Sequence, residues 1–349
     1  DRGFREKPRT IPAFESMVVH LMLMNSPSEN QEPENDVIAY RAIATYYPGE
    51  EIREVFANQW FTLVTSVLPT PQALEEIERL RFDNIHTPDI LRDRGIRALM
   101  LLAEKTAGTI AKAELFRSAA LDQTKSGNTA IAKLAAERWL EFATDKDLIE
   151  EAKYGHNYID QISRQRILDL AESRTPGEAV TLLSQAASAC EEMSYFGQKE
   201  YEKYYTQVTE KWAALMKEKI PAEQAYNHLR MIEGRGSRVA ARRESVMADV
   251  FLSLTDKLPL RVGIESAKHA VWTAERAELK SLLAGGAQKW ANLVRQLPPE
   301  EGLEAIKTVR GYYGELKRHA DILERELCGK VACGIKPEEF LKQLSGGPG

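Results

Sequence analysis

The stretch Lys203–Ile220, KYYTQVTEKWAALMKEKI, carries the pattern that decides the fold. Its apolar residues recur every three or four positions, while Glu, Lys and Thr fill the positions between them. This spacing places the apolar side chains on one face of an α-helix. The stretch therefore predicts a helix with one buried face, and Pro221 directly after it marks the end of that helix.

Similar amphipathic stretches run through most of the chain, separated by Pro, Gly or Ser, and they are rich in strong helix formers. Helix starts are marked by proline in or near the first turn with acidic residues behind it, where the free amides and the helix dipole favour negative charge. Such starts are predicted at Pro48, Thr70, Thr87, Thr175 and Pro299. The sequence indicates an all-α protein with almost no strands.

Four of the five tryptophans belong to a recurring unit, Trp-x-x-(Leu/Phe), at Trp60, Trp139, Trp212 and Trp290. Their separations are 79, 73 and 78 residues, and in three units a proline follows nine residues after the tryptophan. Fainter copies of the unit begin at Ile167 and Phe251. The basic period is therefore close to 40 residues, and a small residue, such as Ala73 or Ala225, follows early in the next helix.

A period near 40 residues made of two helices is typical of stacked helical hairpins, in which neighbouring hairpins supply the core. The alternative is chance recurrence in an ordinary helical protein. We predict a right-handed α-solenoid of roughly seven hairpins, similar in general architecture to tetratricopeptide-like or HEAT-like superhelices. Residues 48–340 form the predicted array. Residues 1–47 form an N-terminal extension, with an apolar helix at Phe14–Met24 and a polar acidic loop at 25–36, and 341–349 form a flexible tail.

The overall composition excludes some classes of protein. The chain has 349 residues, 43% of them hydrophobic, and a formal net charge of -5. Its longest apolar runs fall well short of the roughly 20 residues that cross a membrane. The net negative charge argues against a protein whose main role is to coat nucleic acid without sequence preference.

The three cysteines, Cys190, Cys328 and Cys333, are too few and too poorly spaced for a disulfide framework or a four-ligand zinc site. Free thiols and a cytoplasmic location are favoured, although Cys328 and Cys333 could form a short disulfide in an oxidising compartment. The chain begins with Asp1 rather than Met. We therefore expect either a processed mature chain or an excised fragment, with any targeting segment removed from view.

Catalytic motifs are not evident in the sequence. The six histidines are scattered without metal-ligand spacing, and no Gly-x-Ser-x-Gly nucleophile motif occurs. A cluster of His319, Asp321 and Glu324 reads more readily as a solvated helix face than as an acid–base site. Gly234-Arg-Gly joins two predicted helices, a context that does not fit a dinucleotide loop. We expect no enzyme activity, no metal and no cofactor.

The most basic window of the chain surrounds the turn that begins at Gly234. Five positive charges stand against Glu233 alone, and Ser237 is placed to cap the following helix. This turn is a candidate contact for a phosphate, a nucleic-acid backbone or an acidic protein segment. The alternative is an interhelical turn whose arginines pair with acids on neighbouring hairpins. The arginines are Arg230, Arg235, Arg238, Arg242 and Arg243.

A second candidate contact lies at the start of the predicted helix that ends before Pro221. Tyrosines are interleaved with lysines there. Aromatic rings beside cations suit a peptide groove or stacking on bases. Tyr201 and Tyr205 share one helix face and Tyr204 shares the face of Trp212, so one row should be buried and the other partly exposed. The candidate contact residues here are Tyr195, Lys199, Tyr201, Lys203 and Tyr204.

These patterns favour a non-enzymatic scaffold or adaptor that holds another protein, or a peptide of it, along a concave helical surface. The alternative is an RNA-binding helical-repeat protein that uses the same arginines on phosphates and the tyrosines on bases. Neither the identity of the partner nor the oligomeric state follows from the sequence.

Overall fold

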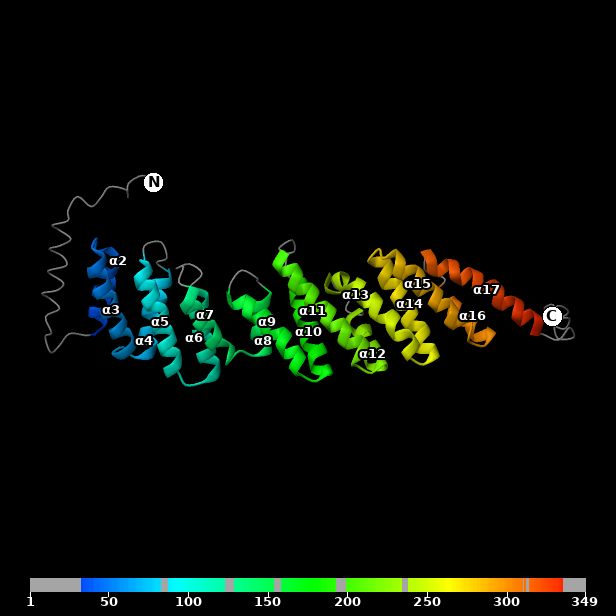
Figure 1. Cartoon of the computed structure of the whole chain (residues 1–349), viewed down its shortest axis with the longest axis horizontal. Helices are drawn as coiled ribbons and strands as arrows, with labels where there is room; N and C mark the ends of the chain where they lie inside the picture. The colour runs from blue at the N-terminus through cyan, green and yellow to red at the C-terminus, as the bar shows by residue number, and fades with distance from the viewer. Residues whose placement is uncertain are drawn as a thin grey trace, which may run out of the picture. The chain divides into compact units, whose positions relative to one another are not determined.

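The computed structural model describes residues 33–82, 87–122, 129–153, 158–192, 199–233, 238–309, 311 and 314–334. Within these ranges the chain forms sixteen α-helices and one short 3₁₀-helix, and it contains no strand (Figure 1). The predicted all-α class is therefore confirmed. In the same ranges, no helix combines the length and the apolar character that a membrane crossing requires.

The contacts divide the chain into two compact units, Asp1–Ser163 and Arg164–Gly349, and each is described by itself. The helices of the first unit are α2 (Pro33–Tyr46), α3 (Glu50–Ser66), α4 (Thr70–Phe82), α5 (Asp89–Lys105), α6 (Thr109–Asp122), α7 (Thr129–Leu140) and α8 (Asp145–Ala152). The boundary falls within α9 (Tyr158–Ser173). The second unit continues with α10 (Pro176–Glu192), α11 (Lys199–Glu218), α12 (Ala222–Glu233), α13 (Arg238–Leu254), the 3₁₀-helix Thr255–Lys257, α14 (Leu260–Arg276), α15 (Lys280–Val294), α16 (Pro299–Lys307) and α17 (Gly314–Gly334).

The helices begin where the proline and acid signals place them. Helices α3, α4, α5, α10 and α16 start at or within two residues of the five predicted positions. Helix α8 adds a start that those signals did not mark. There the Thr144 hydroxyl accepts from the backbone N–H of Asp147, and the Asp147 side chain accepts from the backbone N–H of Thr144. This reciprocal pair is a capping box.

The recurring tryptophans form the centres of the helix contacts. Trp60, Trp139, Trp212 and Trp290 are at most 1% exposed, and they lie on α3, α7, α11 and α15. Phe251, in one of the fainter copies of the unit, is also fully buried on α13. The buried face predicted for the Lys203–Ile220 stretch is therefore confirmed at Trp212.

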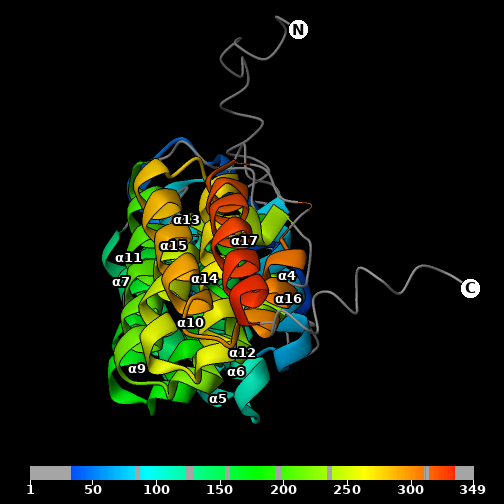
Figure 2. The ribbon, with the colours of Figure 1, turned by 90° about the vertical axis from the view of Figure 1, so that its right-hand side faces the viewer.

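Within each unit, helices pack against their chain neighbours and against the helix after next. Helix α3 packs on α2 and α5, and helix α11 packs on α10, α12 and α13. Helices α14, α15, α16 and α17 lie side by side (Figure 2). They enclose one continuous apolar cluster around Trp290, to which Val271, Leu316 and Leu323 contribute. This cluster draws its side chains from all four helices, so none of them buries its apolar surface alone.

The N-terminal prediction is partly corrected. The predicted polar loop at 25–36 overlaps the start of α2, because Pro33 begins that helix and Glu34 and Asp36 lie in its first turn. Proline at the first helical position and acids in the first turn favour a helix over a loop there. The predicted helix Phe14–Met24 and the predicted tail 341–349 lie outside the described residues.

Candidate binding groove

The tyrosines predicted as contacts lie mostly inside the second unit. Tyr201 and Tyr204 of α11 are 1% and 3% exposed, so they line the interior rather than a contact surface. The row of Tyr204 and Trp212 is buried as predicted, and in the other row Tyr205 is half-buried whereas Tyr201 is buried as well. Lys203 is exposed. Tyr195 lies outside the described residues, as does the side chain of Lys199.

The predicted arginines divide in the same way. Arg243 is 1% exposed on α13, so it cannot reach a partner from this position. Arg230 is exposed at the end of α12, where its Nη1 lies 2.7 Å from His269 Nε2. Arg235 and the side chains of Arg238 and Arg242 lie outside the described residues. The alternative interpretation of the window, in which its arginines pair within the protein, therefore holds for Arg243.

Arg243 is the centre of a buried polar network between α10 and α13. Its Nε donates to Glu191 Oε1 at 2.9 Å, and its Nη2 donates to Glu191 Oε2 at 3.2 Å. The remaining N–H groups reach Ser184 Oγ at 3.3 Å and Ser188 Oγ at 2.8 Å. The guanidinium carbon lies 5.9 Å from the centre of the Trp212 ring. Such a forked pair satisfies the charges of both partners away from water.

Two phenols and a thiol complete the network. Tyr205 donates to Glu191 Oε1 at 2.6 Å, and Tyr201 donates to the backbone carbonyl of Cys190. Burial, together with the charge of Glu191, raises the pKa of Tyr205, so this phenol remains a hydrogen-bond donor. Burial raises the pKa of the Cys190 thiol to about 11. A buried thiol that stays protonated is a packing residue rather than a nucleophile.

The exposed face of α10 above this network forms a groove with α12. The groove has a volume of about 330 Å³. Most of its lining comes from α10 at helical spacing, and His228 of α12 lies at its edge. The lining residues are Thr181, Ser184, Gln185, Ser188, Ala189, Glu192 and His228. Small hydroxyl and amide side chains therefore leave room between two helices and offer hydrogen bonds to whatever enters.

The hydroxyl of Ser188 in the groove is held by hydrogen bonds within the second unit. The Ser188 hydroxyl accepts from Arg243 and donates to the Ser184 carbonyl at 2.9 Å, so its proton is already engaged. In the described part of the chain, no three His, Cys, Asp or Glu side chains converge as metal ligands. Cys328, exposed on α17, is a free thiol in the structure.

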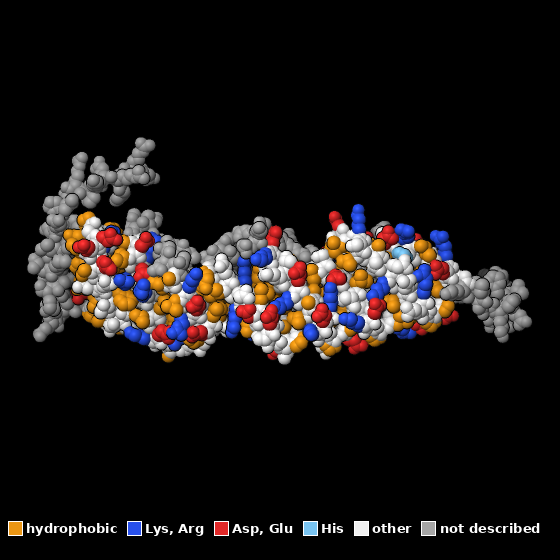
Figure 3. All heavy atoms as spheres, viewed as in Figure 1, with side chains coloured by type: hydrophobic (Ala, Val, Ile, Leu, Met, Phe, Trp, Pro, Cys, Tyr) orange, Lys and Arg blue, Asp and Glu red, His pale blue; other side chains and the backbone are white. Residues whose placement is uncertain are grey.

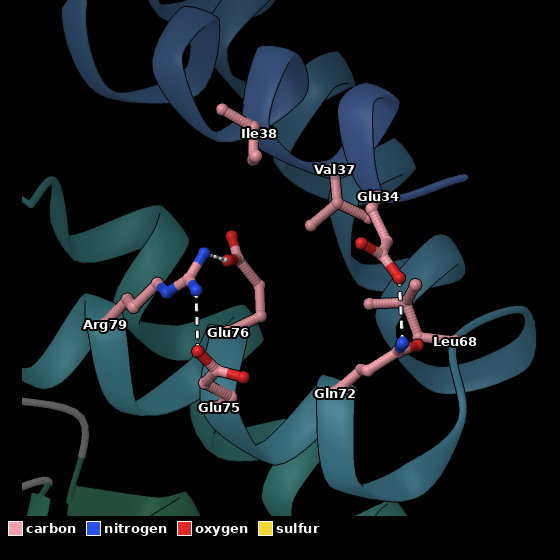
Figure 4. Close-up of a pocket in the computed structure, with 8 residues that line it drawn as sticks. All are labelled: Glu34, Val37, Ile38, Leu68, Gln72, Glu75, Glu76 and Arg79. Atoms are coloured by element: carbon pink, nitrogen blue, oxygen red, sulfur yellow. Dashed lines mark hydrogen bonds and ion pairs between the residues drawn. The ribbon is translucent and has the colours of Figure 1, made fainter. Parts of the chain in front are cut away.

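A smaller cavity lies at the corresponding seam of the first unit, between α2 and α4 (Figure 4). Its volume is about 80 Å³. Gln72 donates to Glu34 at 2.7 Å across it, and Arg79 pairs with Glu75 at 2.6 Å. Glu76 is buried beside it, where it accepts from Arg41 at 3.1 Å and from Trp60 Nε1 at 3.2 Å. This cavity is crossed by its own polar contacts.

Sequence reasoning did not identify the residues that form the larger groove. The sequence did contain a pattern at this place, a row of polar residues at helical spacing among alanines. Its members are Thr181, Ser184, Gln185 and Ser188. Such a row resembles any solvated helix face, and only the packing of α12 beside it makes a groove. No known protein family, curated protein or solved structure matches this chain.

Proposed function

We propose that the helices of each unit are stacked hairpins of an α-solenoid, and that the chain is a non-enzymatic scaffold that binds an extended segment of another protein. The hairpins would be α2–α3, α4–α5 and α6–α7 in the first unit, and α10–α11 to α16–α17 in the second. Packing between helices next but one along the chain supports this arrangement, because that contact joins successive hairpins.

Hydrogen bonds at a constant sequence separation also support the repeat. Lys105 Nζ donates to the carbonyl of Thr65 at 2.6 Å, and Lys257 Nζ donates to the carbonyl of Lys217 at 2.6 Å. Both pairs are separated by 40 residues. In each pair a lysine from the end of one helix neutralises the carbonyl end of an earlier one. This recurrence agrees with the 40-residue period of the sequence.

The α10–α12 groove is the observation that carries the binding proposal. Side chains four residues apart on α10, such as Thr181 and Gln185, are displaced by about 6 Å along the helix axis. Residues that face the same way on an extended peptide repeat at about 6.6–6.8 Å. The polar row of α10 can therefore contact successive residues of an extended segment and hydrogen-bond its backbone.

The test fills the groove with an ion pair taken from the first unit. Ser184→Arg combined with His228→Glu places there the same residue types as Arg41 and Glu76, and it leaves the net charge unchanged. A photo-cross-linking amino acid at Gln185 identifies the partner in cells, and a synthetic peptide from the cross-linked region is then titrated into the purified chain. We expect at least tenfold weaker peptide binding by the filled variant.

The matched control is Thr206→Arg with Gln207→Glu, two exposed positions on α11 that also leave the net charge unchanged. This variant should bind the peptide as the wild type does. Equal peptide affinity of the filled variant and the wild type would contradict peptide binding in the groove. A photo-cross-linking amino acid at Glu210 of α11 that captures the partner as strongly as the one at Gln185 would contradict the placement of the partner on α10.

RNA binding is the alternative function, favoured by the exposed Lys203 and Arg230. The burial of Arg243 against Glu191 removes one of its predicted phosphate contacts. On the face shown in Figure 3, Lys and Arg side chains are interspersed with Asp and Glu over the described residues. Filter binding at low and high salt decides between the proposals, because salt-dependent retention of RNA would favour this alternative.

A further inference from the structure

The first two described helices carry an unusual share of exposed apolar side chains. Ile38 and Tyr46 of α2 are 46% and 58% exposed, and Ile52 and Val55 of α3 are 36% and 53% exposed. These are four of the ten large hydrophobic side chains that are exposed in the described part of the chain. Apolar side chains gathered on one hairpin indicate a surface that another segment covers.

The second unit shows what covers the equivalent surface. Helices α3 and α11 share a register, because Trp60 and Trp212 are 152 residues apart and both fully buried. The same separation relates Phe56 to Val208 and Val64 to Met216, which are buried too. Position 52 of α3 therefore corresponds to Tyr204 of α11.

Tyr204 is 3% exposed, whereas Ile52 is 36% exposed. The difference lies in α9, the helix that precedes α10 and α11. The guanidinium carbon of Arg164 in α9 lies 5.1 Å from the centre of the Tyr204 ring. Lys211 of α11 forms an ion pair with Glu172, near the other end of α9. A preceding helix thus covers on α11 the face that Ile52 occupies on α3.

We propose that the N-terminal segment Phe14–Met24 packs on the α2–α3 hairpin at this face, as α9 packs on α11. The segment lies outside the described residues, and its sequence predicts an apolar helix. Eleven helical residues extend about 16 Å, enough to cover most of one face of α3. Residues 25–32 connect it to Pro33, and eight residues span up to roughly 28 Å, so the chain is long enough to turn back.

The chemistry of the segment fits this surface. Phe, Met, Val and Leu make up most of Phe14–Met24, and they would meet isoleucine and valine rather than charge. An array of hairpins also needs a cap at its terminal repeat, because the last apolar face has no neighbouring repeat. The segment would protect the end of the first unit. This inference does not depend on the α10–α12 groove.

Cysteine cross-linking in the full chain tests the contact directly. In a background without Cys190, Cys328 and Cys333, Ile52→Cys is combined with Met17→Cys or Leu21→Cys, two positions one helical turn apart. We expect mild oxidation to form a disulfide at least tenfold faster in one of these pairs than in the control pair. The control combines the same N-terminal cysteine with Glu137→Cys, an exposed position on α7. Equal rates in both would overturn the proposal.

Hydrogen exchange gives a second readout that needs no cysteine. Val18→Asp with Leu21→Asp in the full chain should place charge against the apolar face and release the segment. We expect at least tenfold faster exchange in α2 and α3, with unchanged exchange in α14 and α15. The control, Ser26→Asp with Ser28→Asp, adds the same charge to the connecting residues and should leave α2 and α3 unchanged. Unaltered exchange in the apolar-to-Asp variant would also overturn the proposal.

Discussion

The α2–α4 seam of the first unit and the α10–α12 seam of the second differ in the side chains that line them. Glu76 and His228 are 152 residues apart, as are Trp60 and Trp212. Arg41 and Ser184 each lie eight residues after the proline that begins their helix. In the first unit Arg41 binds Glu76, and in the second Ser184 and His228 line an open groove.

The two cavities differ in volume and in the side chains that line them. The α2–α4 cavity has a volume of about 80 Å³ and a mostly charged or polar lining that includes Glu75, Glu76 and Arg79. The α10–α12 groove has a volume of about 330 Å³, and small hydroxyl and amide side chains line most of it. The larger opening therefore lies where the facing side chains are small and mostly uncharged.

A second difference lies beneath the seams. Leu91 of α5 and Arg243 of α13 are also 152 residues apart, and they are 0% and 1% exposed. The first unit fills this position with an apolar side chain, whereas the second places a charge there and neutralises it with Glu191. Replacing both members of such a pair by apolar residues of similar volume is often neutral or stabilising, while replacing one leaves a buried charge.

The largest expected effect comes from breaking this ion pair on one side. Arg243→Met leaves Glu191 buried without its cation, so we expect a loss of about 3–5 kcal/mol in the free energy of unfolding. Adding Glu191→Met removes the second charge as well, although it leaves the Tyr205 hydroxyl without its acceptor, and should recover part of that loss. Urea unfolding of the two variants measures both values. A single variant within about 1 kcal/mol of the wild type would show that the charge is not effectively buried.

A smaller effect distinguishes the two tryptophans. Trp60 Nε1 donates to the carboxylate of Glu76, whereas Trp212 Nε1 has no hydrogen-bond partner in the described part of the chain. Phenylalanine removes similar volume at both sites, but at position 60 it also removes a donor from a buried carboxylate. We expect Trp60→Phe to cost about 1–2 kcal/mol more than Trp212→Phe in urea unfolding. Equal costs would mean that this hydrogen bond contributes no net stability.

The sequence predicted the helices well because the signals involved are local. Apolar spacing, proline at helix starts and the tryptophan units depend on residues a few positions apart, and α3, α10 and α16 begin where those signals lie. The interior position of Trp212 followed from the same spacing.

The candidate site could not be predicted in the same way. Arg243 and Glu191 are 52 residues apart, and each belongs to a stretch that reads as solvated when taken alone. Tyr201 and Tyr204 are covered by Arg164 of α9, which the local spacing around the tyrosines does not specify. The burial of these polar residues depends on which helices pack together. The groove depends on helix packing in the same way, because α10 and α12 both contribute to its lining.

The smallest expected effect is a difference in pH dependence between the seams. Burial raises the pKa of Glu76 above its usual value, against the opposing effects of Arg41 and Trp60. The folded chain therefore keeps this proton in a pH range where the unfolded chain has lost it. The resulting contribution to stability is fully present below the unfolded pKa and is lost as the pH rises through the folded pKa.

Glu76→Gln removes this titration while keeping a similar shape. The free energy of unfolding of the wild type, minus that of the variant, should therefore fall as the pH rises from about 4 to about 7. Urea unfolding at a series of pH values measures this difference. Glu78→Gln, exposed on the same helix, is the control for the loss of one negative charge. A constant difference for Glu76→Gln would mean that burial and the opposing effects of Arg41 and Trp60 cancel, and a rising difference would mean that those effects outweigh burial. Either result would contradict the prediction.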